Sequence, residues 1–403
     1  MEKNKPFCVA PFVNLYYKGS LTYDRVSPCC EGRFEEEKSQ CSYDEAWHGE
    51  KFTDIRAAML RGEAHDICTR CIDIENAGGF NAREHYARIA RRWEKTRGEA
   101  IEYSVETGNQ YDKPIALDYR GSNLCNLKCR MCHPGSSSQI ADEILKNADD
   151  YKDVGYETGK SNLFQRGAIN TWINGVPTDN LVRFKILGGE PLLMEEVFDT
   201  LDRLAEEPNA KDVIISITSN GTRFPPQLER YTEKFDRVVI RLSLDGVDDV
   251  QEYIRTNGNW PKLLSNCHLF AELGERRSNF GVGFSFVVQA YNFFQLPKLV
   301  EFCDEWHQRY PSLSDSFFSA VEQDWLSSAI LSEEHRAPVI AELEASTSPL
   351  AEQVLRIVRD YDATRKNVDR KRFAAYTVLQ DRLRGTDLVD IDPRYKEYLN
   401  AES

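Results

Sequence analysis

The chain has 403 residues, 41% of them hydrophobic and 11% aromatic, a composition that excludes a largely disordered protein. Its formal net charge of −14 at pH 7 repels nucleic-acid phosphates, so nucleic acid is a poor default partner. No stretch approaches the roughly 18 apolar residues of a membrane span, and the N-terminus lacks a signal-peptide core, so we expect a cytoplasmic protein without a membrane partner. There the 11 cysteines are expected to be reduced and to serve metal binding or catalysis.

Residues 1–81 form a cysteine-rich domain, the first expected element of the chain. Five of its six cysteines lie in the segments FCVAPF, SPCCEG and DICTRCID. Two separated cysteines followed by a C-x2-C pair can bind a [4Fe-4S] cluster completely or hold a tetrahedral zinc ion. Both readings stay open at this point.

Residues 82–112 are expected to form a helical linker with a dense basic run. On a helix such a run makes either a solvated face or a binding stripe. If the helix lines the mouth of the following domain, Arg88, Arg91 and Arg92 are candidates for binding an acidic peptide segment.

Residues 113–325 alternate short β-branched runs with stretches of helical periodicity, which predicts a parallel sheet or barrel. Residues 326–403 are expected to form a helical C-terminal region, and Cys267 and Cys303 are expected to be small core residues. The candidate strands are 115–119, 183–187, 213–218, 237–243, 281–288 and 314–321.

The loop after the first of these strands, GSNLCNLKCRMCHPG, carries Cys125, Cys129 and Cys132 in a C-x3-C-x2-C spacing. Thiolates this close can converge on one metal centre, and three of them leave one iron of a four-iron cluster open. A zinc knuckle is the alternative, but it requires a fourth protein ligand. His133 is poorly placed to be that ligand because it directly follows Cys132.

This spacing, its place after the first strand and the motifs downstream resemble the radical S-adenosylmethionine (radical SAM) enzyme family over about residues 113–325. The resemblance implies a partial (β/α)6 TIM-like barrel with a [4Fe-4S] cluster on Cys125, Cys129 and Cys132. It also implies that S-adenosylmethionine chelates the fourth iron and is cleaved to a 5′-deoxyadenosyl radical. Met131 occupies the slot where the family usually has an aromatic residue near the adenine.

Further motifs resemble family segments that contact S-adenosylmethionine, and each follows a predicted strand, where barrel active sites lie. They are LGGEP, TSNGT and SLDG, with an arginine in EYIRTNGNW that matches a family arginine near the ligand carboxylate. The implied cofactor-binding residues are Met131, Gly188, Gly189, Glu190, Pro191, Ser219, Asn220, Ser243, Asp245 and Arg255.

The N-terminal cysteines resemble the cluster-binding halves of SPASM and twitch domains, which normally follow the barrel but here precede it. The resemblance implies an auxiliary [4Fe-4S] cluster on Cys8, Cys29, Cys68 and Cys71. Cys29 is preferred to Cys30 because it follows a proline, as in those domains. Cys41 and His48 are left without a role.

The expected function is a radical SAM oxidoreductase or maturase that abstracts a hydrogen atom from an unactivated carbon of its substrate. A peptide is the first choice of substrate, and a sugar or other small metabolite is the alternative. An electron donor such as flavodoxin or ferredoxin is the expected partner. A competing class is a non-enzymatic metal-binding scaffold, which does not account for three motifs at strand ends.

Overall fold

The computed structural model describes residues 7–19, 25–30, 32, 42–69, 71–72, 82–98, 113–156, 171–314, 316–365 and 367–399. The chain divides into two compact units. The first unit comprises Met1–Asn123, Leu163–Ile217 and Gln227–Val239, and the second comprises Leu124–Asn162, Thr218–Pro226 and Ile240–Ser403. The four ranges expected from the sequence stay a prediction.

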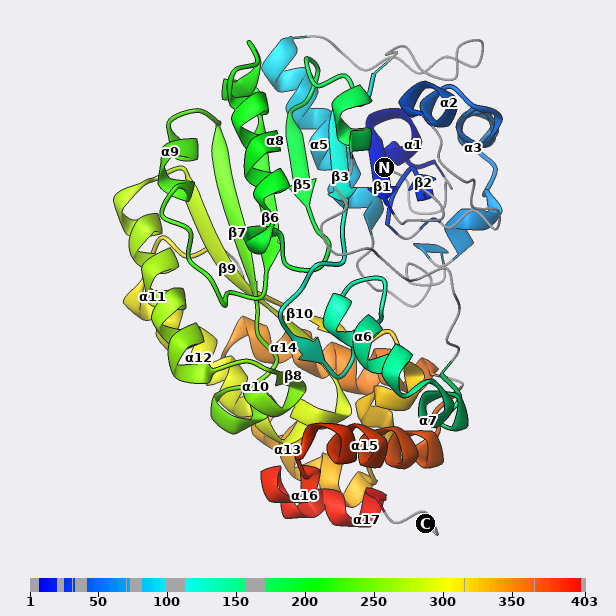
Figure 1. Ribbon diagram of the computed structural model, residues 1–403, viewed down its shortest axis with the longest axis vertical. Coiled ribbons are helices and arrows are strands. Elements are labelled where there is room, and N and C mark those ends of the chain that lie inside the picture. The colour runs from blue at the N-terminus through cyan, green and yellow to red at the C-terminus, as the bar shows by residue number, and fades with distance from the viewer. Residues whose placement is uncertain are drawn as a thin grey trace. The chain divides into compact units, whose positions relative to one another are not determined.

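In the described part of the chain, eight strands follow the order β10-β9-β7-β6-β5-β3-β1-β2 in one sheet, and two short strands pair as β4-β8. The pairs β1–β3, β3–β5, β5–β6 and β9–β10 are parallel, and Figure 1 shows β1, β3 and β5 side by side. The expected α/β fold with a mostly parallel sheet is confirmed. The strands are β1 (Asn14–Lys18), β2 (Arg25–Ser27), β3 (Ala116–Arg120), β4 (Lys128–Cys129), β5 (Arg183–Ile186), β6 (Ile214–Ser219), β7 (Arg237–Ser243), β8 (Arg255–Thr256), β9 (Phe280–Val288) and β10 (Phe317–Ala320).

Six strands match the runs expected from the sequence. Strand β7 has the expected bounds; β3, β5, β6 and β9 differ by at most one residue at either end, and β10 is shorter than expected. Strands β1 and β2 were not expected. Four of the five residues of β1 are buried, so it lacks the polar–apolar alternation that marks a half-exposed strand.

Three helices of the first unit, α1 (Ala10–Val13), α3 (Glu50–Arg61) and α5 (Ala82–Arg97), contribute to an apolar core that includes Phe12, Ile55, Met59 and Trp93. Arg56 is buried there and donates hydrogen bonds of 2.8 Å to the carbonyl oxygens of Pro11 and Trp47, which joins three helices. The N-terminal cysteines are therefore held by a folded scaffold. The helices of this unit are α1 (Ala10–Val13), α2 (Tyr43–Trp47), α3 (Glu50–Arg61), α5 (Ala82–Arg97), α8 (Glu195–Ala205) and α9 (Leu228–Thr232).

The second unit contains the expected C-terminal helices, and its described residues after 326 form no strand. Cys267 and Cys303 are buried in α11 and α12, which confirms them as core residues. The helices of this unit are α6 (Ser138–Lys146), α7 (Ala148–Asp153), α10 (Asp248–Ile254), α11 (Trp260–Arg276), α12 (Leu296–Arg309), α13 (Glu333–Ala345), α14 (Pro349–Leu355), α15 (Arg370–Arg384), α16 (Leu388–Ile391) and α17 (Lys396–Leu399).

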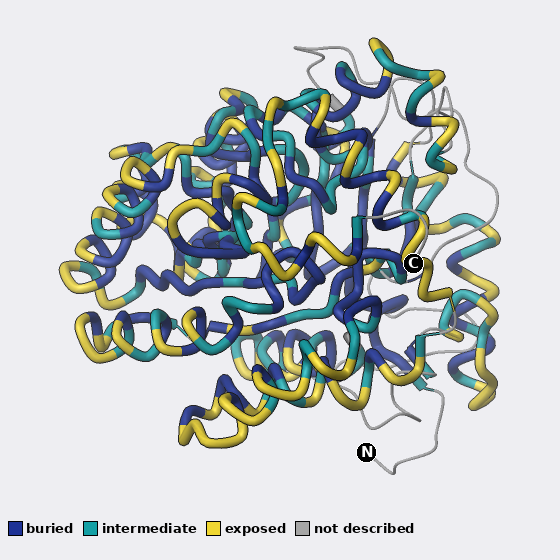
Figure 2. Tube along the Cα trace, turned by 90° about the horizontal axis from the view of Figure 1, so that it is seen from below, coloured by how far each residue is buried: buried dark blue, intermediate teal, exposed yellow. Residues whose placement is uncertain are grey.

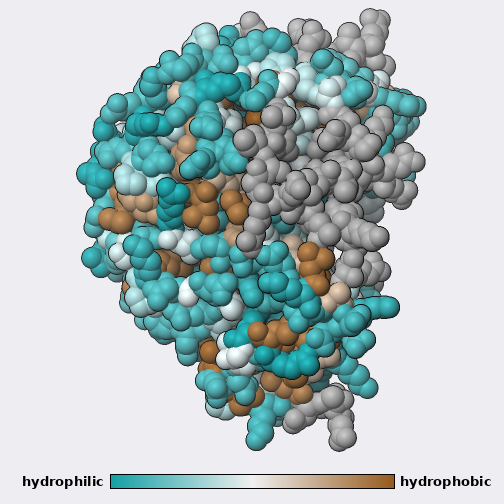
Figure 3. All heavy atoms as spheres, in the orientation of Figure 1, coloured by the Kyte–Doolittle hydropathy of each residue, from teal (hydrophilic) through white to brown (hydrophobic). Residues whose placement is uncertain are grey.

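Exposed apolar side chains are scattered over the described surface. The strands are largely buried while the helices alternate buried and exposed positions (Figure 2). The face in Figure 3 is mostly hydrophilic with small hydrophobic patches. None of the helices within the described ranges has the length and apolar character needed to cross a membrane.

Candidate functional site

The cysteine loop (residues 125–132) lies in the second unit and contains a short strand pairing. Strand β4 pairs antiparallel with β8, which sets Cys129 opposite Arg255. Cys125 and Cys129 are each 8% exposed and belong to one apolar cluster, against which Met131 and Cys132 pack. The structure thus gathers the three predicted thiols and Met131 in one place.

Nitrogen donors point at two of the three sulfurs. The Sγ of Cys125 accepts hydrogen bonds from Asn220 Nδ2 at 3.8 Å and from the Leu127 amide at 3.5 Å. The Sγ of Cys129 accepts from Arg255 Nη1 at 3.7 Å. Burial raises the pKa of the Cys129 thiol, and the Arg255 charge opposes this effect. These donors favour the thiolate, the form of cysteine that ligates iron.

Arg255 is held in place by a buried ion pair with Asp245. Its Nε and Nη2 donate to Asp245 Oδ2 at 2.8 and 2.7 Å, while the Val287 amide donates to Oδ1 at 2.8 Å. Although burial disfavours its charged form, Asp245 and Cys129 raise the pKa of Arg255. Burial raises the pKa of Asp245 in turn, opposed by Arg255. Both oxygens of Asp245 are engaged within the chain, so Asp245 orients Arg255 toward the sulfur.

A polar network after β6 supports the first cysteine. Asn220 Nδ2 donates to Asn126 Oδ1 at 2.9 Å, and its Oδ1 accepts from the amide and hydroxyl of Thr222 at 3.0 and 2.7 Å. Ser219 Oγ accepts from the Gly221 amide at 3.0 Å, which shapes the turn. Ser243 ends β7 and is half-buried. Asn126 and Thr222 were not predicted as site residues. Their role depends on hydrogen bonds to Asn220, which the sequence does not show.

The LGGEP segment lies in the first unit, at the end of β5. Gly188 has φ +137°, and a Cβ there would approach the Ser122 carbonyl oxygen to 2.7 Å, so only glycine fits. The Gly189 amide donates to the same oxygen at 3.0 Å. Glu190 is buried and accepts from the Leu192 amide at 3.1 Å, just before Pro191. The glycines therefore let the chain turn closely over the end of β3.

The four predicted N-terminal thiols line one cavity, also in the first unit. This cysteine cavity has about 390 Å³ of empty space, its opening to solvent included. Burial raises the pKa of Cys8 to about 12 and that of Cys68 to about 11. The cavity is lined by Cys8, Cys29, Gly32, Ile67, Cys68, Cys71, Ile72, Arg83 and Tyr86.

Cys29 and Cys30 differ in their position at this cavity. Cys29 lines it, and its Sγ accepts from the Gly32 amide at 3.3 Å, whereas Cys30 is not one of the lining residues. His48 is exposed at the end of α2, and Cys41 lies outside the described residues.

Both sets of thiols are chemically suited to iron. Cysteine thiolates are the usual protein ligands of iron–sulfur clusters, and three of them in the cysteine loop leave one iron open while four in the cavity close a cluster. As the described chain stands, no group of three or more His, Cys, Asp or Glu side chains is arranged to hold a single metal ion.

The basic face of α5 does not lie where the sequence suggested. Arg92 Nη2 donates to Asp236 Oδ2 at 2.8 Å and to the Asp212 carbonyl at 3.0 Å, and Arg97 pairs with Asp212 at 3.3 Å. These aspartates precede β6 and β7, at the amino ends of the strands, whereas barrel sites lie at the carboxyl ends. Arg92 therefore does not meet the condition that the helix lines the mouth, because local carboxylates hold it at the opposite edge.

Residues 119–303 match the family model described as Radical SAM superfamily. This part of the chain is therefore similar to the radical SAM superfamily, which implies a [4Fe-4S] cluster and S-adenosylmethionine. Members of the superfamily are enzymes.

Two curated proteins and a solved structure are similar to the chain. It is 24% identical over 221 residues to molybdenum cofactor biosynthesis protein 1 of Homo sapiens, covering 54% of this chain and 31% of that protein. It is 25% identical over 201 residues to pre-heme d1 synthase of Dinoroseobacter shibae, covering 48% and 41%. It thus spans less than half the length of either relative. Streptococcus suis SuiB bound to precursor peptide SuiA is 15% identical, with a TM-score of 0.35, over 93% of this chain and 75% of that chain.

Proposed function

We propose that this protein is a radical SAM oxidoreductase or maturase whose cluster is held by Cys125, Cys129 and Cys132. When bound, the cluster supplies the electron that cleaves S-adenosylmethionine, and the resulting 5′-deoxyadenosyl radical removes a hydrogen atom from an unactivated carbon of the substrate. The observation that carries this proposal is that the three cysteines of one loop pack together, with nitrogen donors directed at two of the sulfurs.

The chain's own residues have distinct tasks in this proposal. Arg255 and Asn220 donate to the sulfurs and stabilise the negative charge of the thiolates. Gly188 and Gly189 give the ligand close access to the backbone, and Glu190 with Pro191 fixes the turn that follows. Met131, Ser219 and Ser243 complete the proposed S-adenosylmethionine site.

We also propose that the cysteine cavity holds an auxiliary [4Fe-4S] cluster on Cys8, Cys29, Cys68 and Cys71, in a SPASM- or twitch-like module that precedes a partial barrel. Four lining thiols and apolar neighbours support this assignment. All four ligand positions of such a cluster are filled by protein, so it accepts an electron or helps to hold substrate.

The decisive test is anaerobic reconstitution with iron and sulfide, followed by an assay for 5′-deoxyadenosine from S-adenosylmethionine under reducing conditions. We expect about eight iron atoms per chain and cleavage of the cofactor. Zinc in place of iron at both sites, with no cleavage, would instead establish a metal-binding scaffold.

The substrate is proposed to be a peptide, with a small metabolite as the second candidate. The names of the two curated relatives favour the second candidate, since both refer to the making of a small cofactor. Adding cell extract to the reconstituted enzyme, with and without prior protease digestion, separates the two. Stimulation of 5′-deoxyadenosine formation that protease abolishes indicates a peptide, and stimulation that survives indicates a metabolite. We propose a cytoplasmic location with flavodoxin or ferredoxin as the electron donor.

A further inference from the structure

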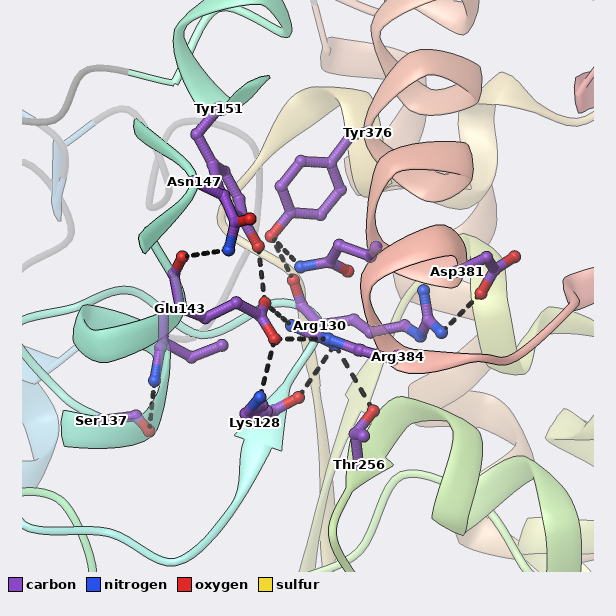
Figure 4. A network of polar contacts seen from close by, with 12 residues as sticks. Lys128, Arg130, Ser137, Glu143, Asn147, Tyr151, Thr256, Tyr376, Asp381 and Arg384 are labelled. Atoms are coloured by element: carbon purple, nitrogen blue, oxygen red, sulfur yellow. Dashed lines mark hydrogen bonds and ion pairs between the residues drawn. The ribbon is translucent and has the colours of Figure 1, made fainter. Parts of the chain in front are cut away.

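Helix α15 contacts the cysteine loop on both sides of Cys129, within the second unit (Figure 4). Arg384 Nη1 donates to the Lys128 carbonyl oxygen at 3.0 Å, and the Tyr376 hydroxyl donates to the Arg130 carbonyl oxygen at 2.9 Å. The residues before and after the central cysteine are therefore bound through their backbones by the same helix.

The side chain of Arg130 lies between α15, the residues just after it and α10. It is 0% exposed, and its Nη2 donates to Asp381 Oδ1 at 2.6 Å and to Thr386 Oγ1 at 2.7 Å. Its guanidinium lies 3.6 Å from the centre of the Tyr253 ring, and Nε donates to the Tyr253 carbonyl at 2.9 Å. A buried cation with this many partners holds one orientation.

A second buried cation joins α15 to the helix that follows the loop. Arg384 Nη2 pairs with Glu143 Oε1 at 2.8 Å, and Lys128 Nζ pairs with Glu143 Oε2 at 3.0 Å. The Tyr151 hydroxyl donates to Glu143 Oε1 at 2.6 Å. The carboxylate of α6 and the guanidinium of α15 thus clamp Lys128 between them (Figure 4).

We propose that α15 is the positioning element of the cysteine loop, with Tyr376, Asp381 and Arg384 as positioning residues. The loop's own regular structure is the two-residue strand β4, which is too short to fix three thiols against their conformational entropy. Ser137 and Ser138 bind the carbonyl oxygens of Leu127 and Cys125, and the contacts from α15 add the constraint on the two residues that flank Cys129. The consequence for cluster binding rests on the proposed function, whereas the ordering of the loop by α15 does not.

The first experiment measures thiol alkylation in the metal-free full-length protein by mass spectrometry. The variants are Tyr376→Phe, which removes one hydroxyl, and Arg384→Gln, with Arg384→Lys as the conservative change. The matched control is Arg382→Gln, on the same helix, whose ion pair with Asp150 is exposed. Cys267, buried in α11, is the internal reference for global unfolding.

We expect alkylation of Cys129 to rise about tenfold or more in Arg384→Gln and less in Tyr376→Phe, with Cys267 and the Arg382→Gln protein unchanged. Arg384→Lys should fall between wild type and Arg384→Gln. If Tyr376→Phe and Arg384→Gln both leave the Cys129 rate at the wild-type value, α15 does not position the loop. An equal rise at Cys267 in both variants also overturns the proposal, because it means a general loss of stability.

The second experiment measures the reconstituted cluster itself. We expect Arg384→Gln to lose iron to a chelator about 10- to 100-fold faster and to show an altered EPR signal, with Arg382→Gln behaving like wild type. Unchanged release and spectrum would show that the loop's order does not matter for the cluster. If wild type binds no iron at this loop, the proposed function fails, while the alkylation result still decides the role of α15.

Discussion

The two sets of cysteines are surrounded by very different chemistry. In the cysteine loop, amide and guanidinium groups donate to the sulfurs of Cys125 and Cys129, and buried ion pairs surround the backbone. The cysteine cavity is lined largely by apolar groups, among them Ile67 and Ile72, and burial raises the pKa of Cys8, Cys29 and Cys68. Hydrogen bonds to sulfur and solvent access both tune an iron–sulfur cluster. The contrast is that charged and amide groups lie beside the sulfurs of the cysteine loop, whereas the cysteine cavity is the more apolar of the two sites.

Removing the cysteine loop's thiols tests the contrast most severely. In the triple variant Cys125→Ala, Cys129→Ala, Cys132→Ala we expect complete loss of 5′-deoxyadenosine formation and of about four iron atoms per chain. The cavity's cluster should remain, because it uses separate thiols. Iron analysis and the cleavage assay on anaerobically reconstituted protein check this. Cofactor cleavage by the triple variant would remove the radical SAM assignment of these cysteines.

The reciprocal change is Cys68→Ala with Cys71→Ala. We expect it to remove about four iron atoms and to abolish substrate turnover while cleavage of S-adenosylmethionine without substrate survives. The same two assays measure this, with the triple variant as the opposite control. If cleavage disappears along with the iron, the two sites do not have the separate roles that their surroundings suggest.

The ion pairs around the cysteine loop predict a dependence of stability on pH. Burial opposes ionisation of Glu143, but Arg384, Tyr151 and Lys128 lower its pKa from 4.5 to about 2. Its contribution to stability is therefore fully present above about pH 4.5 and is lost as the pH falls toward 2. Glu143→Gln should cost about 3–5 kcal/mol at pH 7, because it leaves buried cations without their anion, and less at pH 3.

Denaturant unfolding of the metal-free protein at several pH values measures this cost. Asp150→Asn is the matched control, since Asp150 pairs with Arg382 of α15 at an exposed position and should cost less than about 1 kcal/mol. If the two variants lose the same free energy of unfolding at pH 7, the buried ion pairs of Glu143 do not contribute more than an exposed pair.

Hydrogen bonding to sulfur is tested by Asn220→Ala. It removes the donor to Cys125 and the link to Asn126, so we expect the cluster in the loop to dissociate about 10- to 100-fold faster and its midpoint potential to fall. The cavity's cluster should keep its potential. Redox titration followed by EPR separates the two signals, and an unchanged potential in the loop would show that the amide has no electronic effect.

The last comparison distinguishes Cys29 from its neighbour Cys30, for which we expect no effect on the auxiliary iron. Cys29→Ala should lose the auxiliary iron, whereas Cys30→Ala should keep it, because only Cys29 is among the lining residues. Iron content after reconstitution measures both. If Cys30→Ala loses the auxiliary iron and Cys29→Ala keeps it, Cys30 is the ligand instead of Cys29.

Local patterns in the sequence located the strands and the cysteine loop well. The β-branched runs placed β7 at its observed bounds, and the need for glycine at position 188 was visible in the LGGEP motif. These features depend on neighbouring residues, which a single sequence displays. The assignments of the cofactor-binding residues stay predictions, since they depend on ligands.

Strand pairings and ion pairs between residues far apart in the chain could not be predicted from local sequence patterns. Strand β1 pairs with β3, which lies about 100 residues later in the chain. Because β1 is buried on both faces, its sequence shows no alternation that would identify it as a strand. Asp381 and Arg384 look like solvated helix charges in the sequence, yet their side chains are buried with partners in the cysteine loop and in α6. A charged residue on a helix is therefore expected to be exposed unless the structure shows a buried ion-pair partner for it.

The clamp on the cysteine loop also has a consequence for how the protein is made. The contacts of Arg130 with Asp381 and of Tyr376 with Arg130 join residues 251 and 246 positions apart. A ribosome that adds about 5–20 residues per second needs roughly 10 to 50 s to pass from the loop to α15. During that interval the nascent thiols are without their clamp and accessible to oxidants. We therefore expect iron to be delivered after the polypeptide has left the ribosome, and chaperones to shield the loop until then.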